Sequence, residues 1–265
     1  TVFGEVEAAA IDDSSEVAWS NRVYGGTYTY RSNSLPIKAR LTAGRSEMAN
    51  EFGPESAPER MSSIKSSEAT LRLSWLLNRG DISVGTTFRK TDLSYTLDDL
   101  FTEFTTSSEE MNEWNSYIES TLDLAGDKLS INPGVHMYAL PDRSEQYFEP
   151  RMRASFWPTG QQGRHQLNAS WGIYHQILSG LSDERDLGNL FTAWITTPES
   201  QDPTTSMHGI LGWNVSLTPW LHGAIEGFYK SYDHISAPIF SPFPKFTTTL
   251  QEASGTALGT DIRMD

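Results

Sequence analysis

The sequence contains no cysteine among its 265 residues, so it has no disulfide, no zinc site with thiolate ligands and no cysteine nucleophile. It also has no run that approaches the ~20 apolar residues of a transmembrane helix. Its mean hydropathy is -0.44, and 37% of its residues are hydrophobic. These values are typical of water-soluble proteins, but they are equally typical of membrane strands, which expose one face to lipid and the other to water.

Positive charge is scarce and negative charge is concentrated in a few places. The net charge is -14, and five segments hold 22 of the 34 acidic residues but only 4 of the 20 basic ones. These acidic segments are 11–18, 47–68, 96–113, 140–149 and 179–202. Clustered lysine and arginine are required to bind nucleic acid, and no such cluster occurs between the acidic segments. We therefore expect no nucleic-acid partner.

Helical periodicity is almost absent, and alternation with a period of two replaces it. In segment 70–77, for example, the apolar residues Leu71, Leu73, Trp75 and Leu77 share one face. Alternation over segments of about ten residues indicates β-strands whose two faces meet different surroundings. The pattern predicts about twelve strands, at 1–10, 18–32, 36–48, 67–77, 81–95, 111–124, 128–139, 146–157, 164–177, 207–217, 220–233 and 256–265.

The connections between these strands alternate between short and long. Short turns are predicted near 33–35, 78–80, 125–127, 158–163 and 218–219, and long polar or acidic loops near 49–66, 96–110, 140–145, 179–206 and 234–255. Short turns at one end and long loops at the other are the asymmetry of an outer-membrane β-barrel, with periplasmic turns and extracellular loops. No sequence repeat indicates a propeller. The predicted fold is an all-β, antiparallel transmembrane barrel.

A soluble antiparallel sheet would also alternate apolar and polar residues, so the polar face decides between the two interpretations. It carries bulky charges among Gly, Asn and Ser, namely Arg72, Arg89, Glu119, Arg151, Arg153, Glu226 and Lys230. Such a face suits a water-filled or plugged lumen, and no helical segment is available to cover the apolar face. We therefore assign Val84 to the lipid face and Thr87 to the lumen face.

Aromatic residues near the strand ends fit the girdles that mark the two membrane interfaces of a barrel. Trp75 and Trp220 lie beside short turns, and Trp114 and Tyr95 lie beside long loops.

Two stretches resemble the barrel of TonB-dependent outer-membrane receptors. Segment 149–176, EPRMRASFWPTGQQGRHQLNASWGIYHQ, resembles a pair of barrel strands in which a "PR" strand runs to a short turn and an aromatic- and Gly-rich strand returns. Segment 207–238, MHGILGWNVSLTPWLHGAIEGFYKSYDHISAP, resembles the following hairpin, and 255–263 resembles the next strand. Together these three stretches cover 69 residues.

This resemblance implies a wide barrel whose lumen is plugged by an N-terminal domain. Members of the family bind a scarce nutrient, such as a siderophore, cobalamin or an oligosaccharide, and admit it when the TonB complex pulls on the plug. The implied partners are outer-membrane lipid, a small nutrient ligand and the TonB complex, and the implied location is the bacterial outer membrane. We interpret residues 1–265 as part of one barrel domain, with the plug and the terminal strands lying outside this sequence.

No catalytic or metal-binding constellation is predicted, and no cofactor is expected. The six histidines, His136, His165, His175, His208, His222 and His234, are scattered without the spacing of a metal site. No nucleophile elbow, phosphate loop or dinucleotide fingerprint occurs. The acidic run 183–186 lacks the spaced oxygen ligands of a calcium loop and is interpreted as a solvated loop. A lipase-like barrel enzyme stays open as an alternative. It would need a serine nucleophile, and the many serines single out no candidate for that role.

The predicted ligand contacts lie in the long loop 179–206, at Asn189, Phe191 and Trp194, because binding residues are commonly carried on loops above a rigid scaffold. A second group is predicted to form a polar network inside the lumen, and consists of Glu149, Arg151, Arg153, Glu226 and Lys230.

Two other functions stay open beside a receptor for energy-coupled uptake. One is a passive, porin-like or structural outer-membrane barrel without TonB coupling. The other is a soluble, lectin-like all-β protein, whose apolar faces would pack against each other instead of against lipid.

Overall fold

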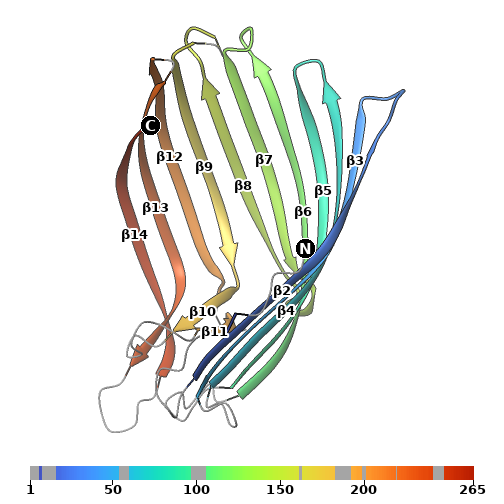
Figure 1. Cartoon of the computed structure of the whole chain (residues 1–265), viewed down its shortest axis with the longest axis vertical. Helices are drawn as coiled ribbons and strands as arrows, with labels where there is room; N and C mark the ends of the chain where they lie inside the picture. The colour runs from blue at the N-terminus through green and yellow to red at the C-terminus, as the bar shows by residue number, and fades with distance from the viewer. Residues whose placement is uncertain are drawn as a thin grey trace.

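One curved antiparallel sheet contains most of the residues that the structure describes (Figure 1). The computed structural model describes residues 6–7, 16–53, 60–96, 106–160, 163–182, 192–198, 201–218, 220–240 and 248–265. Twelve strands form the sheet, and they are β1 (Val6–Glu7), β2 (Glu16–Arg31), β3 (Ile37–Gly53), β4 (Arg60–Leu77), β5 (Gly80–Thr96), β6 (Thr106–Leu124), β7 (Leu129–Leu140), β8 (Glu145–Phe156), β9 (His165–Gln176), β12 (Thr204–Thr218), β13 (Leu221–Phe240) and β14 (Thr248–Met264). Each strand is hydrogen-bonded to its neighbours in this order.

Two shorter elements lie apart from this sheet. β10 (Leu178–Ser182) and β11 (Thr192–Thr196) pair with each other only, and a short 3-10 helix, η1 (Pro141–Arg143), connects β7 to β8. None of the described segments forms a helix that is long and apolar enough to cross a membrane.

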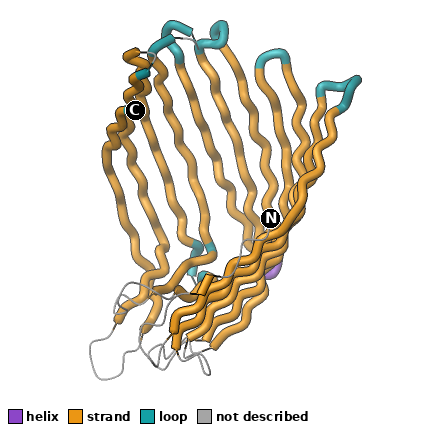
Figure 2. Tube along the Cα trace, viewed as in Figure 1, coloured by secondary structure: helices purple, strands orange, loops and turns teal. Residues whose placement is uncertain are grey.

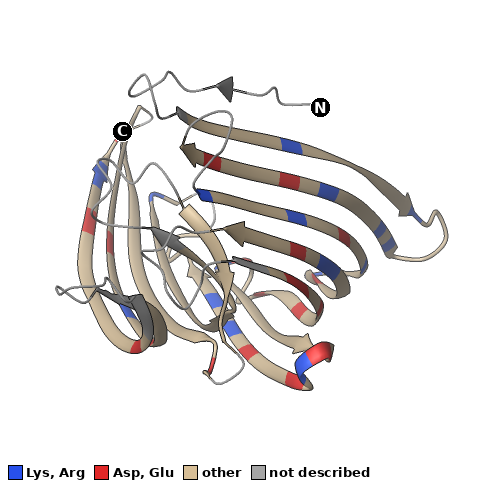
Figure 3. Ribbon diagram, turned by 90° about the horizontal axis from the view of Figure 1, so that it is seen from below, with Lys and Arg blue, Asp and Glu red and all other residues tan. Residues whose placement is uncertain are grey.

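The sheet bends around a hollow, as the strands show when they are viewed end-on in Figure 3. We call the surface that faces this hollow the inner face, and the opposite surface the outer face. The end with short connections is the turn end, and the opposite end is the loop end (Figure 2). Among the described residues, β14 pairs only with β13 and β1 only with β2, so the two edges of the sheet are not joined. The fold is that of an incomplete antiparallel barrel, as the alternation predicted.

The tight turns at the turn end explain the register. β4 and β5 are joined by Asn78 and Arg79, and Gly80 follows with a φ of 116°. A Cβ atom at Gly80 would lie 1.8 Å from the backbone oxygen of Thr121, so only glycine fits this position. The turn thereby fixes which residues of β5 face outward, because a shift of one residue would exchange the two faces.

Near the turn end the outer face is apolar and the inner face is polar. Phe88, Ile118 and Leu211 point outward and are 51%, 54% and 69% exposed. The apolar surface of β4 reaches from Leu77 to Ala69, which is about 26 Å along the strand. That length is of the same order as the ~25 Å apolar band of outer-membrane barrels.

Across β3 to β6 this apolar band ends at one row of neighbouring residues. Its last row consists of the cross-strand partners Ala43, Ala69, Phe88 and Trp114. The next outward-facing row towards the loop end consists of Arg45, Ser67, Lys90 and Asn112. Four strands therefore change from apolar to polar at the same height, which indicates a boundary in the surroundings of the barrel.

Beyond this boundary the outer face of these strands is polar, and on β5 the polarity of the two faces is inverted. Leu93 and Tyr95 of β5 point inward and are 2% and 7% exposed, whereas Asp92 and Ser94 point outward. A small core forms here from Met111, Leu140 and Ile177. The expectation that Tyr95 belongs to an aromatic girdle is therefore wrong. The other three girdle candidates are exposed, with Trp75 at 37%, Trp114 at 50% and Trp220 at 76%.

Several observed strands are longer than the sequence predicted, and their main extensions lie at the loop end. β3 and β4 continue to Gly53 and from Arg60, and β5 and β6 continue to Thr96 and from Thr106. These extensions occupy acidic segments that the sequence assigned to loops. Most of the predicted strand at 1–10 lies outside the described residues. Its described part, Val6–Glu7, pairs with β2.

Candidate functional site

The inner face carries the polar side chains that a solute in the hollow would meet. Three clusters of these side chains can be distinguished, each spanning several strands. They are built by cross-strand register, since residues from distant parts of the sequence become neighbours on the same face.

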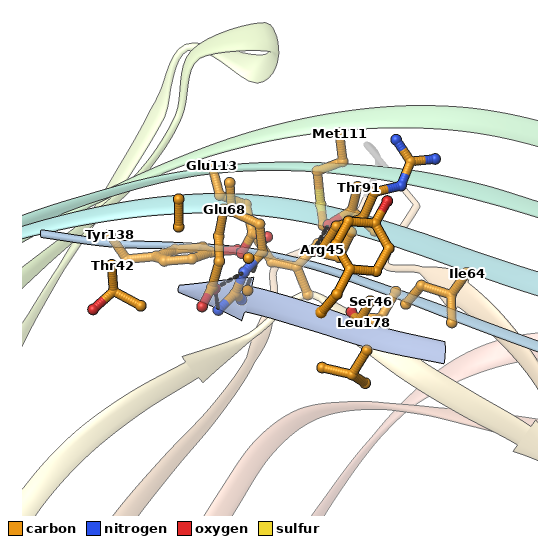
Figure 4. Close-up of a pocket in the computed structure, with 18 of the residues that line it drawn as sticks. Thr42, Arg45, Ser46, Ile64, Glu68, Thr91, Met111, Glu113, Tyr138 and Leu178 are labelled. Atoms are coloured by element: carbon orange, nitrogen blue, oxygen red, sulfur yellow. Dashed lines mark hydrogen bonds and ion pairs between the residues drawn. The ribbon is translucent and has the colours of Figure 1, made fainter. Parts of the chain in front are cut away.

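The first cluster joins β4, β5, β6 and β7 through one arginine. Arg89 contacts Glu68 at 2.9 Å and Glu113 at 3.7 Å. The Tyr138 hydroxyl donates to Glu113 at 2.5 Å. Glu113 is buried, with 6% exposure, so its charge depends on these two partners. We call Glu68, Arg89, Glu113 and Tyr138 the carboxylate–arginine cluster (Figure 4).

The second cluster lies nearer to the turn end. Arg72 forms an ion pair with Glu119 at 2.8 Å and lies over the ring of Tyr117, with 6.0 Å between the guanidinium carbon and the ring centre. Tyr117 stacks on His136 with ring centres 5.0 Å apart. A Cβ atom at Gly85 would lie 2.4 Å from the Tyr117 ring, so glycine at this position makes room for the ring.

The third cluster lies on β8, β9 and β12. Arg151 is paired with Glu149 at 2.5 Å, and the backbone N–H of His175 donates to Glu149 at 2.7 Å. The Arg151 guanidinium lies 4.5 Å from the centre of the Tyr174 ring, a cation–π distance. Tyr174 in turn contacts His208, with 5.2 Å between ring centres.

The structure places all five residues of the predicted lumen network on the inner face but brings only some together. Glu149 and Arg151 are in direct contact, and Lys230 is the cross-strand partner of His208 at the edge of the same cluster. Arg153 and Glu226 lie on other rows, and neither has an ion pair among the described residues. A single continuous network of these five residues therefore stays a prediction.

Sequence reasoning placed Arg89, Arg72 and Glu119 on the polar face but did not identify their partners. Glu68 and Glu113 lay near the ends of the predicted strands 67–77 and 111–124 but were given no role there, and the structure places them within β4 and β6. Strand parity relative to Arg72 and Arg89 is the signal that would have found Glu68, because all three are on the inner face.

Of the predicted ligand contacts, Asn189 and Phe191 lie outside the described residues. Trp194 belongs to β11, and its backbone N–H donates to the Ser62 hydroxyl of β4 at 3.1 Å. Figure 1 shows β10 and β11 lying across the loop end of the sheet. Trp194 thus belongs to an element docked on the inner face, where the sequence had indicated a loop above the scaffold. Its role in ligand binding stays a prediction.

A cavity of about 740 Å³ lies between the inner face of β2 to β7 and the chain at 175–178. The carboxylate–arginine cluster forms part of its wall, and Figure 4 shows Glu68, Thr91, Glu113 and Tyr138 around it with Leu178 opposite. Its charged groups are paired with one another, so hydroxyl groups and apolar side chains provide most of the remaining surface. Its size is within the range of small-molecule sites.

Among the described residues, no group of three or more His, Asp or Glu side chains is arranged to hold a metal ion. The arrangement of the inner face suits reversible contact with a solute by hydrogen bonds and paired charges.

Comparison with known proteins gives matches at the level of structure. No protein-family model matches the sequence, and no curated protein matches it. The siderophore receptor PirA from Pseudomonas aeruginosa is 12% identical with a TM-score of 0.63, covering 95% of this chain and 50% of that chain. The alcaligin outer-membrane receptor FauA from Bordetella pertussis is 14% identical with a TM-score of 0.63, covering 94% and 44%.

A third solved structure, the RagAB peptide importer, is 12% identical with a TM-score of 0.58, covering 94% of this chain and 34% of that chain. The chain thus spans half or less of the length of these three structures. At these identities the likeness concerns the fold, and it confirms the barrel architecture that the resemblance at 149–176 and 207–238 implied.

Proposed function

We propose that this chain, which has the barrel fold of TonB-dependent outer-membrane receptors, forms part of the wall of such a receptor in the outer membrane of a Gram-negative bacterium. The receptor would bind a scarce nutrient at its loop end and admit it by energy coupled through TonB and a plug domain encoded elsewhere in the parent protein. The solved structures that share the fold are named as siderophore receptors and as a peptide importer, so the proposed ligand is a small nutrient of this general size.

The change in polarity of the outer face at one height supports the membrane location most directly. The outer face changes from Ala43, Ala69, Phe88 and Trp114 to charged and polar residues within one row. A soluble lectin-like sheet would need a second layer over its apolar face, and the described residues supply none. Contact with lipid explains why the outer face is apolar and why this apolar surface ends at one row of residues.

The inner face supports a route for a polar solute and gives no indication of chemistry on it. The buried carboxylates of Glu113 and Glu149 are occupied by arginine partners and by two further donors, the Tyr138 hydroxyl and the His175 backbone N–H. We therefore propose transport without chemical transformation of the ligand. Passive diffusion through an unplugged barrel is the competing function, and it predicts uptake that does not require energy.

The test uses the full-length protein encoded by the parent gene, expressed in cells with and without TonB. We expect the protein in the outer-membrane fraction, a plug-sized domain in its sequence, and nutrient-dependent growth that is lost without TonB. Equal growth in both strains would favour passive diffusion. Recovery of the protein in the soluble fraction without detergent would contradict the membrane proposal itself.

A further inference from the structure

The β10–β11 hairpin departs from the barrel wall between β9 and β12 and returns to it at nearly the same point. The backbone N–H of Thr197 donates to the Ile177 carbonyl at 2.7 Å, which closes the base of the hairpin. Residues 178–196 are therefore an excursion from the wall whose two ends are adjacent. Its two described strands, β10 and β11, lie across the loop end of the sheet, at the mouth of the hollow (Figure 1).

Three hydrogen bonds join this excursion, and a fourth joins its base at Thr197, to parts of the chain that are distant in sequence. Asn50 of β3 donates to the Thr192 carbonyl at 2.7 Å, and the N–H of Trp194 donates to Ser62 of β4 at 3.1 Å. The Thr196 hydroxyl donates to Glu109 of β6. Arg143 of η1 donates to the Thr197 carbonyl at 2.7 Å. The hairpin is thus fixed at both ends of β11 and along its length.

Apolar packing holds the same hairpin against the inner face. Ala193 has no exposed surface and Ile195 is 4% exposed. Ile177, at the base, packs with Met111 and Leu140 in the small core of the loop end. Buried side chains of this kind oppose local opening, because opening exposes the apolar surface and breaks the hydrogen bonds together. A mobile lid would instead show exposed side chains and few contacts.

The cavity of about 740 Å³ lies behind the base of the hairpin. Gln176, Ile177 and Leu178 form one side of it, and the inner face of β2 to β7 forms the other. A solute that enters from the loop end must pass beside the hairpin to reach the carboxylate–arginine cluster.

We propose that the β10–β11 hairpin is a fixed crossbar in the mouth of the barrel, which sets the largest solute that can reach the inner face from the loop end. It selects by size and stays docked while solutes pass. This inference rests on the proposed function only in taking the loop end as the extracellular end.

Thiol labelling can test the crossbar directly, because these 265 residues have no cysteine and each introduced thiol is the only one in this part of the barrel wall. Ser46→Cys places a thiol in the wall of the cavity, where Ser46 is exposed (Figure 4). Ser94→Cys places a thiol on the outer face beyond the apolar band. Full-length protein in intact cells is treated with a small membrane-impermeant maleimide or with a maleimide that carries a long poly(ethylene glycol) chain.

We expect Ser94→Cys to react with both reagents and Ser46→Cys to react with the small one only. Replacing residues 178–196 by two glycines should then let the long reagent label Ser46→Cys about tenfold faster or more. Equal labelling of Ser46→Cys by the long reagent before and after excision would overturn the crossbar. Failure of the small reagent at Ser46→Cys would overturn it too, because the hairpin would then be a seal. Failure at Ser94→Cys would instead contradict the proposed orientation.

Point variants at Ala193 test whether the hairpin must be docked on the inner face, and not merely present, to exclude the long reagent. Ala193→Cys should react with the small reagent at least about tenfold more slowly than Ser94→Cys, because a docked Ala193 is fully buried. Ala193→Arg should undock the hairpin and admit the long reagent to Ser46→Cys, while Ala193→Gly should not. Gel mobility before and after heating reports whether each barrel is folded. Fast labelling of Ala193→Cys in a folded barrel would show a mobile lid and overturn the proposal.

Discussion

The turn-side and loop-side halves of β3 to β6 are parts of the same strands, yet their outer faces differ in polarity, and on β5 the inner face differs as well. In the turn-side half of β5 the residues Ile82, Val84 and Phe88 point outward and the inward positions are polar. In the loop-side half Leu93 and Tyr95 point inward and the outward positions are polar. The backbone geometry continues unchanged, so the difference comes from what surrounds each half. Lipid outside favours the first arrangement and water outside favours the second.

The largest expected effect comes from placing a charge on the inner face of the loop-side half. Leu93→Arg would bury a guanidinium where Leu93 is 2% exposed. We expect a loss of about 3–5 kcal/mol in the free energy of unfolding, because the charge would lose its water and the packed leucine would be lost, while the cross-strand neighbour Glu109 already accepts from Thr196. Urea titration of the full-length protein in lipid vesicles measures it.

Thr87→Arg is the matched control, since it places the same charge on the inner face of the same strand within the polar half. Equal losses at the two positions would mean that the inner face does not change character along β5.

The next effect tests the outer face of the turn-side half. Val84→Arg should cost about 2–4 kcal/mol if Val84 lies near the middle of the bilayer. Ser94→Arg, on the same strand and the same face but beyond the boundary row, should change stability by less than about 0.5 kcal/mol. The same titration in vesicles compares them. An equal loss of stability for Val84→Arg and Thr87→Arg would contradict the assignment of Val84 to the lipid face and Thr87 to the lumen face.

The position of this boundary also explains what the sequence could predict. The strands and their order follow from period-two alternation, and the faces of Leu71, Val84 and Ile118 were assigned correctly. The loop-end boundaries of β3, β4 and β6 were wrong because the outer face becomes polar beyond the row of Ala43, Ala69 and Trp114. Read along the sequence, such a change looks like the end of a strand. The acidic residues of segments 49–66 and 96–110 then appeared to belong to loops.

The site was less predictable than the fold. That Arg89 faces the lumen follows from parity, but its pairing with Glu68 and Glu113 depends on the register of three strands. The hairpin at 178–196 gives no periodic signal. It is held by contacts with Asn50 and Ser62, more than a hundred residues away, so local sequence could not predict that it docks.

A smaller effect is expected for the paired charges of the lumen. Glu113→Gln keeps the shape of the side chain but removes the charge that faces Arg89 and accepts from Tyr138. Because Glu113 is buried, we expect a loss of about 1–3 kcal/mol. Glu68→Gln is the matched control, since Glu68 is more exposed to the hollow and should cost less. A larger loss of stability for Glu68→Gln would mean that Arg89 is stabilised mainly by Glu68 of β4 and less by Glu113 of β6.

The smallest effect is expected for a similar cluster on the other side of the wall. Glu47 lies on the outer face beyond the boundary and pairs with Arg22 at 3.4 Å and Arg45 at 2.9 Å. Both arginines are largely exposed, so water and salt screen the pairs, and Glu47→Gln should cost less than about 1 kcal/mol. Raising the salt concentration should abolish that small loss while leaving most of the loss at Glu113. If Glu47→Gln instead cost as much as Glu113→Gln at high salt, the outer face at this height would not be in water, and the boundary row would have to lie nearer the loop end.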